Sequence, residues 1–277
     1  MQAPTSLTVT GFSQETTYAQ TRPNTDIAGV TFTPPSAILD ATSVMNFDAP
    51  KDISAIQFTN ANRTLSFDTA KKDTIAFSTH TTGMLVININ SPIMAAAGNP
   101  YQAGWNYQSF GVWAEDTDYT IPNVTIKGDS GGLSIGSPTA GGSIPTSGGG
   151  SFTGLISAVE SSDLGRTELM TGTLTVTVDF GARTAALVSS DMAAEGGVLQ
   201  AHDMVSGTLS YAAGQNALTG TLTTKFNGLS GPATAKFYGP AAQEIGGVFA
   251  LTAPDSSNNQ DNTPVRFVGA FGAARGP

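Results

Sequence analysis

The chain has 277 residues, of which 32 are glycine and 12% are charged, and its formal net charge is −9. This acidic balance argues against nucleic acids and anionic membranes as partners, because both carry negative charge themselves. The chain contains no cysteine, which excludes disulfides, thiolate metal sites and cysteine nucleophiles.

The sequence also lacks the hydrophobic segments that serve membrane insertion or export. No stretch reaches the roughly 20 apolar residues that a membrane-spanning helix needs. Residues 1–4 are followed by neither the basic region nor the apolar region of a signal peptide. We therefore expect no transmembrane helix, and no signal peptide within the sequence as given.

Short runs of β-branched and aromatic residues predict strands throughout residues 1–142, which we interpret as an N-terminal β-rich, handle-like domain. The candidate strands are residues 6–12, 55–58, 64–68, 74–79, 84–90, 108–114 and 123–126. Helix signals are scarce: residues 92–97 could form a single helical turn, and residues 100–105 have the composition of a loop.

Residues 128–132 (GDSGG) match the phrase around the nucleophilic serine of chymotrypsin-like proteases. That chemistry needs a histidine base beside the serine, oriented by a buried carboxylate. His80 is the only histidine upstream of Ser130, and it lies too close in sequence for a two-barrel protease. We therefore interpret residues 128–132 as a turn rather than as a catalytic site.

A short acidic cluster precedes this segment. Glu115, Asp116 and Asp118 offer several carboxylates, but calcium-binding loops place their oxygen ligands at a defined spacing that is missing here. We interpret the cluster as a solvated loop.

Residues 136–150 have the composition of turns and linkers, with glycine, serine and proline and little apolar side chain to pack. We place a domain boundary within this segment. The prediction is an N-terminal domain of residues 1–142 and a C-terminal domain of residues 143–277.

The C-terminal domain shows a regular succession of short alternating strands separated by turn signals. In residues 173–180 (TLTVTVDF), for example, the apolar residues share one face and the threonines the other. The expected strands are 152–160, 173–180, 185–189, 205–211, 218–226, 233–238, 246–253 and 265–271. About eight such strands are enough to close an antiparallel barrel, so the predicted fold class is all-β, a β-rich domain followed by a barrel.

The C-terminal end carries the most distinctive pattern of the sequence, residues 237–249 (FYGPAAQEIGGVF) followed by residues 271–275 (FGAAR). Tyr-Gly-Pro interrupts a strand, and paired glycines mark a sharp coil or a close backbone approach. The pattern resembles the closing hairpin of the barrels in transferrin-binding protein B and its surface-lipoprotein and hemophore relatives. This resemblance implies a secreted or surface-exposed binding protein of a Gram-negative bacterium, not an enzyme.

Some members of this superfamily are hemophores, so the resemblance makes haem the leading ligand and an outer-membrane receptor of the TonB-dependent type the recipient. His80 and His202 are the two histidines of the chain, and neutral imidazole is a good axial ligand of haem iron. We expect these two to be the iron ligands. The alternative for each is a surface or structural histidine, which is the usual role of a lone one.

Aromatic residues gather between residues 101 and 113, in a chain that is only 8% aromatic. Tyr101 and Trp105 fall in the expected loop, where they could cover a porphyrin or anchor a protein partner. Phe110 and Trp113 fall in an expected strand, and we interpret them as packing residues. Tyr101 and Trp105 are therefore the candidates for lining the haem pocket.

Two alternatives to haem capture remain open at this point. The first is a protein-interaction module that docks a host or cell-surface macromolecule through the loops of the barrel. The second is a barrel in the outer membrane itself, which would need a continuous outward apolar band; the many outward threonines, serines and glycines argue against it.

Overall fold

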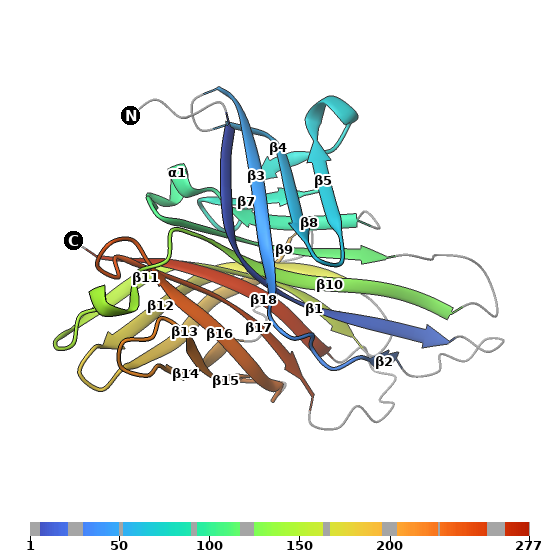
Figure 1. The fold of residues 1–277 in the computed structure, drawn as a ribbon. Helices are drawn as coiled ribbons and strands as arrows, with labels where there is room; N and C mark the ends of the chain where they lie inside the picture. Colours follow the sequence, from blue (N-terminus) through green and yellow to red (C-terminus); the bar gives the residue numbers. More distant parts are fainter. Residues whose placement is uncertain are drawn as a thin grey trace.

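The computed structural model describes residues 6–21, 30–49, 52–89, 93–116, 125–162, 167–195, 204–226, 228–253 and 264–276. These residues form a curled sheet, named here the handle (residues 6–136), and a closed barrel packed against it (Figure 1). The predicted all-β fold, with a β-rich N-terminal part followed by an eight-stranded antiparallel barrel, is confirmed.

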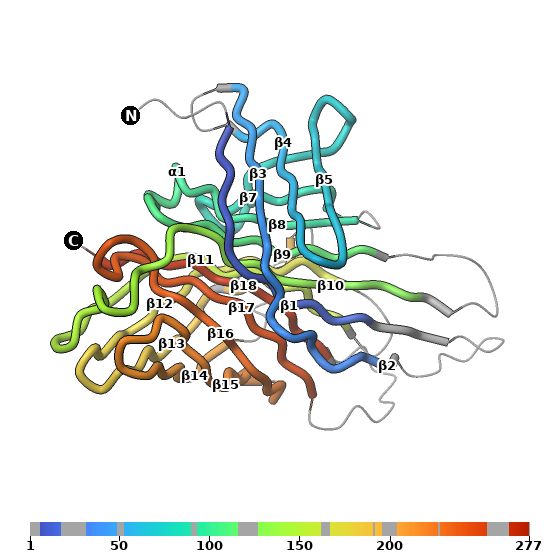
Figure 2. The backbone as a smooth tube through the Cα atoms, viewed as in Figure 1, coloured from blue at the N-terminus to red at the C-terminus, as the bar shows by residue number. Residues whose placement is uncertain are grey.

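The handle is an antiparallel sheet in the order β5-β4-β3-β1-β10-β9-β8-β7-β6, with β2 paired to β1 beside this path. Its two longest strands, β1 and β10, pair along most of their length and extend beside the barrel (Figure 2). The strands are β1 (Ser6–Thr21), β2 (Val30–Phe32), β3 (Leu39–Ala49), β4 (Asp52–Asn60), β5 (Thr64–Asp68), β6 (Ile75–Phe77), β7 (Met84–Ile87), β8 (Ile93–Gly98), β9 (Gln108–Asp116) and β10 (Thr125–Gly136).

Three expectations for the handle are wrong. Residues 93–98 form strand β8 rather than a helical turn, and the turn lies just after it, in α1 (Pro100–Ala103), where the Asn99 side chain accepts from the Tyr101 N–H. Strands β2, β3 and β8 were not expected. Residues 128–132 lie inside β10 rather than in a turn.

The glycines of residues 128–132 serve packing rather than chain reversal. A Cβ on Gly131 would lie 2.7 Å from a ring carbon of Trp113, and a Cβ on Gly132 would lie 2.5 Å from the carbonyl oxygen of Gly269. Glycine is needed here because the Trp113 ring covers one face of β10 and the backbone of the barrel covers the other.

The barrel closes in sequence order, with its last strand paired to its first. Its strands are β11 (Gly149–Ser162), β12 (Thr167–Asp179), β13 (Thr184–Ala194), β14 (Val205–Ser210), β15 (Leu218–Thr224), β16 (Ser230–Tyr238), β17 (Glu244–Thr252) and β18 (Pro264–Arg275). Each expected strand of this domain overlaps one of them.

The interior of the barrel is filled by side chains. Along β12 the buried Leu174, Val176 and Val178 alternate with exposed threonines, as expected from a period of two. Large aromatic residues complete the core, and the rings of Phe180 and Phe237 approach to 5.7 Å between centroids. The barrel is therefore a packed core rather than a container.

Two more apolar clusters hold the handle. One lies inside the curled sheet and includes Met45, Phe58 and Trp113. The other, named here the seam, joins the outer face of the handle to the outer wall of the barrel; its members are Phe12, Met84, Val86, Met94, Ala96, Trp105, Phe110, Val112, Ala114, Leu155, Val159, Leu169, Val248 and Ala270.

Residues 137–148, which connect the two parts, are bound to the barrel. Pro138 bridges to Tyr238, and the Thr139 N–H donates to the Phe237 carbonyl over 2.9 Å. Ile144 is 6% exposed and belongs to the barrel core. The expectation that this segment lacks the side chains to pack is therefore wrong: one isoleucine and a few backbone hydrogen bonds tie it down. The predicted boundary at residue 142 falls within it.

Candidate functional site

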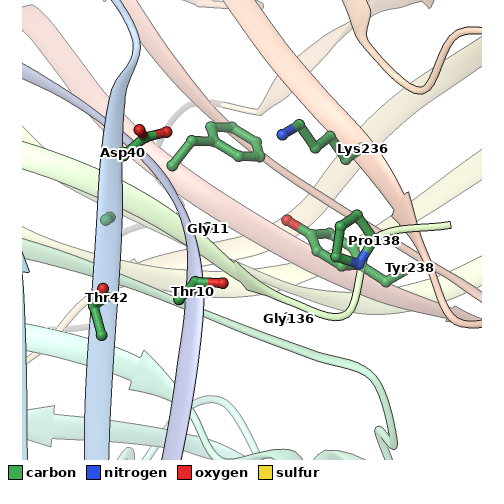
Figure 3. A pocket seen from close by; sticks show the side chains of 10 residues that line it. Thr10, Gly11, Asp40, Thr42, Gly136, Pro138, Lys236 and Tyr238 are labelled. Atoms are coloured by element: carbon green, nitrogen blue, oxygen red, sulfur yellow. The ribbon is translucent and has the colours of Figure 1, made fainter. Parts of the chain in front are cut away.

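A groove of about 370 Å³ opens at one end of the seam, between β1 and β3 of the handle, β16 of the barrel and the connecting segment (Figure 3). It is lined by Thr10, Gly11, Phe12, Asp40, Ala41, Thr42, Gly136, Pro138, Lys236 and Tyr238.

Tyr238 forms part of the groove floor and links the handle to the barrel. Its side chain is 1% exposed, and its hydroxyl lies 2.8 Å from the Ser134 hydroxyl on β10. Burial raises the pKa of Tyr238 far above its ordinary value, so the phenol stays neutral. Gly136 leaves room for the Tyr238 ring, because a Cβ at that position would lie 2.8 Å from a carbon of that ring and would also collide with the Tyr107 carbonyl oxygen.

Opposite charges face the groove from its two sides. Asp40 is the cross-strand neighbour of Phe12, and the Lys236 ammonium lies 5.1 Å from the centroid of the Phe12 ring. Figure 3 shows the Asp40 carboxylate and the Lys236 ammonium pointing toward one another across the groove. Such a site can hold a polar or charged side chain of a partner on an apolar floor.

The pattern at residues 237–249 joins the barrel to the handle through buried hydrogen bonds, and this set of bonds is named here the lock. The Glu244 carboxylate is 2% exposed and accepts hydrogen bonds from the N–H groups of Asn106 (2.7 Å) and Tyr107 (3.1 Å). Burial raises the pKa of Glu244, and these backbone donors partly offset the effect. From the handle, Gln108 Nε2 donates to the carbonyls of Ile245 and Ala273.

Gly239 shows why the pattern needs its first glycine. Its φ is +84°, and the Tyr107 ring lies over it, so a side chain would be both strained and crowded. Sequence reasoning identified the pattern but not its role as a lock. Glu244, the only charged residue of the pattern, was the available signal.

Of the two predicted haem ligands, only His80 lies among the described residues. His80 is half-buried in the segment between β6 and β7, where its backbone N–H donates to the Ser78 hydroxyl over 3.1 Å. The same Ser78 hydroxyl bonds to Glu195 of the barrel. His202 lies outside the described residues, so the pairing of the two histidines stays a prediction.

Tyr101 and Trp105 contact different clusters. Tyr101 packs edge-on against Phe47, at 5.3 Å between ring centroids, next to the core inside the handle. Trp105 is 5% exposed and packs against Phe110 in the seam. Their proposed place in a haem pocket also stays a prediction, and neither lines the groove. No group of three or more metal-ligating side chains occurs within the described ranges.

Ser130 and Glu115 both lie within strands of the handle rather than in loops. Ser130 is 1% exposed within β10, and its hydroxyl has no hydrogen-bond partner in the part of the chain that the structure describes, so no described histidine stands beside it as a base. Glu115 belongs to β9 and forms an ion pair with Arg63 at 3.1 Å. The expectation that it lies in a solvated loop is therefore wrong; Asp118 lies outside the described residues.

Arg63 is the centre of an ionic cluster inside the handle. It also contacts Glu15 (3.4 Å) and Asp129 (3.0 Å), and its guanidinium lies 4.3 Å from the centroid of the Trp113 ring. Burial lowers the pKa of Arg63, and attraction to Glu15 and Asp129 outweighs it, so the pKa is raised. This cluster holds β5 and its turn against β1, β9 and β10.

In the part of the chain that the structure describes, no helix is long and apolar enough to cross a membrane.

Comparison with known proteins links residues 144–275 to the family model of the C-lobe and N-lobe beta barrels of Tf-binding protein B. A search of curated proteins found no match. Solved structures similar to the chain include a mutant of the vaccine antigen transferrin-binding protein B from Haemophilus parasuis Hp5, with 13% identity over 100% of this chain and 77% of that one (TM-score 0.46). The isotype 1 transferrin-binding protein B from serogroup B Neisseria meningitidis shows 15% identity over 88% of this chain and 44% of that one (TM-score 0.47). The N-lobe of lactoferrin-binding protein B of Moraxella bovis shows 11% identity over 95% and 99% of the two chains (TM-score 0.41).

Proposed function

We propose that this chain is a non-enzymatic binding protein at a Gram-negative cell surface, because residues 144–275 match the family model of the barrels of transferrin-binding protein B. Its proposed partner is a host iron-carrier protein of the transferrin class, the partner for which the matched family is named. This is the protein-interaction alternative of the sequence analysis, made more specific.

The filled interior of the barrel is the observation that carries this proposal. Phe152, Phe237, Phe249 and Phe271 are all fully buried within one core, which leaves a ligand the outer surface of the molecule. A protein partner can engage such a surface over a wide area. A small cofactor instead needs a concave pocket that surrounds it.

The lock at the seam supports the same function. Glu244, Gln108 and Tyr238 join handle and barrel through buried hydrogen bonds, so the groove between the two parts has fixed walls. Preorganised surfaces lose little conformational freedom on association. We place one contact of the partner in the groove, between Asp40 and Lys236.

Binding is tested by immobilising the chain and measuring association of purified transferrin and lactoferrin by biolayer interferometry. Charge reversal in the groove, Lys236→Glu, is expected to weaken binding about tenfold or more. The groove would then present two negative charges to the partner instead of one negative and one positive charge. Lys225→Glu is the matched control: Lys225 also lies over a phenylalanine ring, at 5.2 Å, but beyond β15 and away from the groove.

Two outcomes contradict this proposal. If neither transferrin nor lactoferrin binds saturably, the proposed partner class is wrong. Equal loss of affinity in Lys225→Glu and Lys236→Glu would show that the groove is not part of the binding surface and that the net charge of the chain alone affects binding.

Haem capture, with delivery to an outer-membrane receptor, stays a prediction that rests on His80 and His202. The geometry of the described residues favours the protein partner, because Tyr101 and Trp105 pack in separate clusters rather than around one pocket.

A further inference from the structure

A buried arginine lies in the wall between barrel and handle, far along β18 from the groove. Arg266 is 2% exposed, and its guanidinium stacks on the Phe32 ring at 4.8 Å. Its Nη2 donates to the Thr33 carbonyl over 3.0 Å. Nε and Nη1, which carry three of the five N–H donors, have no hydrogen-bond partner among the described residues.

Two buried hydroxyls without partners face the same place. Ser161 is the cross-strand neighbour of Arg266, so their side chains share the outer face of the barrel wall. Ser130 is the cross-strand neighbour of Thr16. The Thr16 hydroxyl donates to the same Thr33 carbonyl that Arg266 contacts.

The orientation of these residues follows from their neighbours. Gly132, two positions along β10 from Ser130, faces the backbone of Gly269, so Ser130 also faces the barrel. The unpartnered Oγ atoms of Ser130 and Ser161 are buried in residues that are 1% and 2% exposed. Positive charge and hydroxyl donors therefore converge between the two sheets.

No acidic side chain of the described part of the chain pairs with Arg266. Burial lowers the pKa of Arg266 to about 10, with no acidic neighbour among the described residues opposing it, so the group is still charged at neutral pH. Glu160, the residue before Ser161, is the cross-strand neighbour of Phe267 in the barrel core and so faces the other way. Glu15, beside Thr16, contacts Arg63 inside the handle.

We propose that Arg266, Ser130 and Ser161 form a binding site for one small oxyanion between the handle and the barrel. A buried cation without a counter-charge is unfavourable, and an oxyanion supplies both the charge and several acceptors for N–H and O–H donors. The donor set selects an anion over a cation. Bound there, the anion contacts both sheets and strengthens their association.

This site is independent of the partner proposed above. Its direct test is equilibrium dialysis of the desalted full chain with inorganic phosphate, sulfate and acetate, each at constant ionic strength set by chloride. We expect one saturable site per chain for at least one of the three oxyanions. The variant Arg266→Met should weaken that affinity by roughly tenfold or more, the usual effect of losing a charge-assisted hydrogen bond.

The matched control is Arg275→Met, at the opposite end of the same strand. Arg275 is exposed, donates from Nη2 to the Gly149 carbonyl over 2.8 Å and lies 5.7 Å from the centroid of the Phe180 ring, so it shares the carbonyl and ring contacts of Arg266 without its burial. Its variant should keep the full anion affinity. The thermal midpoint should rise with the bound oxyanion in wild type and Arg275→Met, and not in Arg266→Met.

Should Arg266→Met fail to fold, the double variant Ser130→Ala and Ser161→Ala keeps the charge and removes the hydroxyls. It should lower the anion affinity while leaving the thermal midpoint in chloride alone close to that of wild type. The proposal is overturned if wild type shows no saturable oxyanion binding. It is equally overturned if the affinity survives in Arg266→Met, or in the double variant.

Discussion

Gly132→Ala tests how closely the handle and the barrel approach. The added Cβ would lie 2.5 Å from the carbonyl oxygen of Gly269 and 2.9 Å from its carbonyl carbon. An ordinary contact between carbon and oxygen is about 3.4 Å, so the overlap is about 0.9 Å and falls on backbone rather than on a movable side chain. Strand β10 cannot retreat by itself, because it pairs with β1 on one side and β9 on the other.

We expect Gly132→Ala to lower the free energy of unfolding by about 2–3 kcal/mol, in the upper part of the range for overpacked sites. For a chain of this size that corresponds to a fall of roughly 3–5 °C in the thermal midpoint. Circular dichroism melts and urea titrations measure both quantities.

Gly142→Ala is the control for this substitution. A Cβ at Gly142 meets nothing within 4 Å, and the residue is exposed in the connecting segment. Its stability should equal that of wild type or rise by a few tenths of a kcal/mol, through reduced freedom of the unfolded chain. If Gly132→Ala has the same thermal midpoint as Gly142→Ala, the two sheets are further apart than the structure places them, and the reasoning about the seam fails.

Three more outcomes are expected. Tyr238→Phe removes the hydrogen bond to Ser134 and should cost about 1 kcal/mol in urea titrations; Tyr211→Phe, whose hydroxyl has no partner among the described residues, should cost nothing, and equal effects would contradict the assignment. Glu244 has a raised pKa in the folded state, so its protonated form is favoured by folding: its contribution should be fully present below the pKa of the unfolded chain and be lost as pH rises through the raised folded pKa. Thermal midpoints of wild type minus Glu244→Gln should therefore fall with rising pH above about 4.5, and a difference that is flat or rises would refute the sign. If haem is a ligand, a hemin titration followed by absorbance should give a saturable Soret shift that weakens in His80→Ala and in His202→Ala; a wild type without such a shift ends the haem prediction.

The strands of the barrel were predictable because their faces differ in chemistry. Leu174, Val176 and Val178 alternate with threonines, and this period alone indicates which side faces the core. The same logic failed for residues 128–132. There the glycines are required by the close approach of Trp113 and Gly269, which come from other strands. Nothing in the local sequence distinguishes such a run from a turn.

The groove could not be predicted from local sequence patterns, because its walls also come from distant segments of the chain. Asp40 and Lys236 are nearly 200 positions apart, 236 minus 40, and they face one another only after two sheets dock. The sequence placed Trp105 in a loop, and its packing against Phe110 could be seen only in the structure. Its expected place in a haem pocket stays a prediction. Sequence patterns therefore located the strands of the barrel and the family that residues 144–275 match, whereas sites that depend on docking had to come from the structure.

The pairing of the first barrel strand with the last has a consequence for synthesis. The handle has all of its strands once residue 136 has emerged, but β11 must wait for β18 before the barrel can close. The seam depends on the same late strands, because Val248 of β17 and Ala270 of β18 cover part of its apolar face. A growing chain therefore carries an uncovered hydrophobic surface until β18 is made, and during that interval it needs protection from self-association.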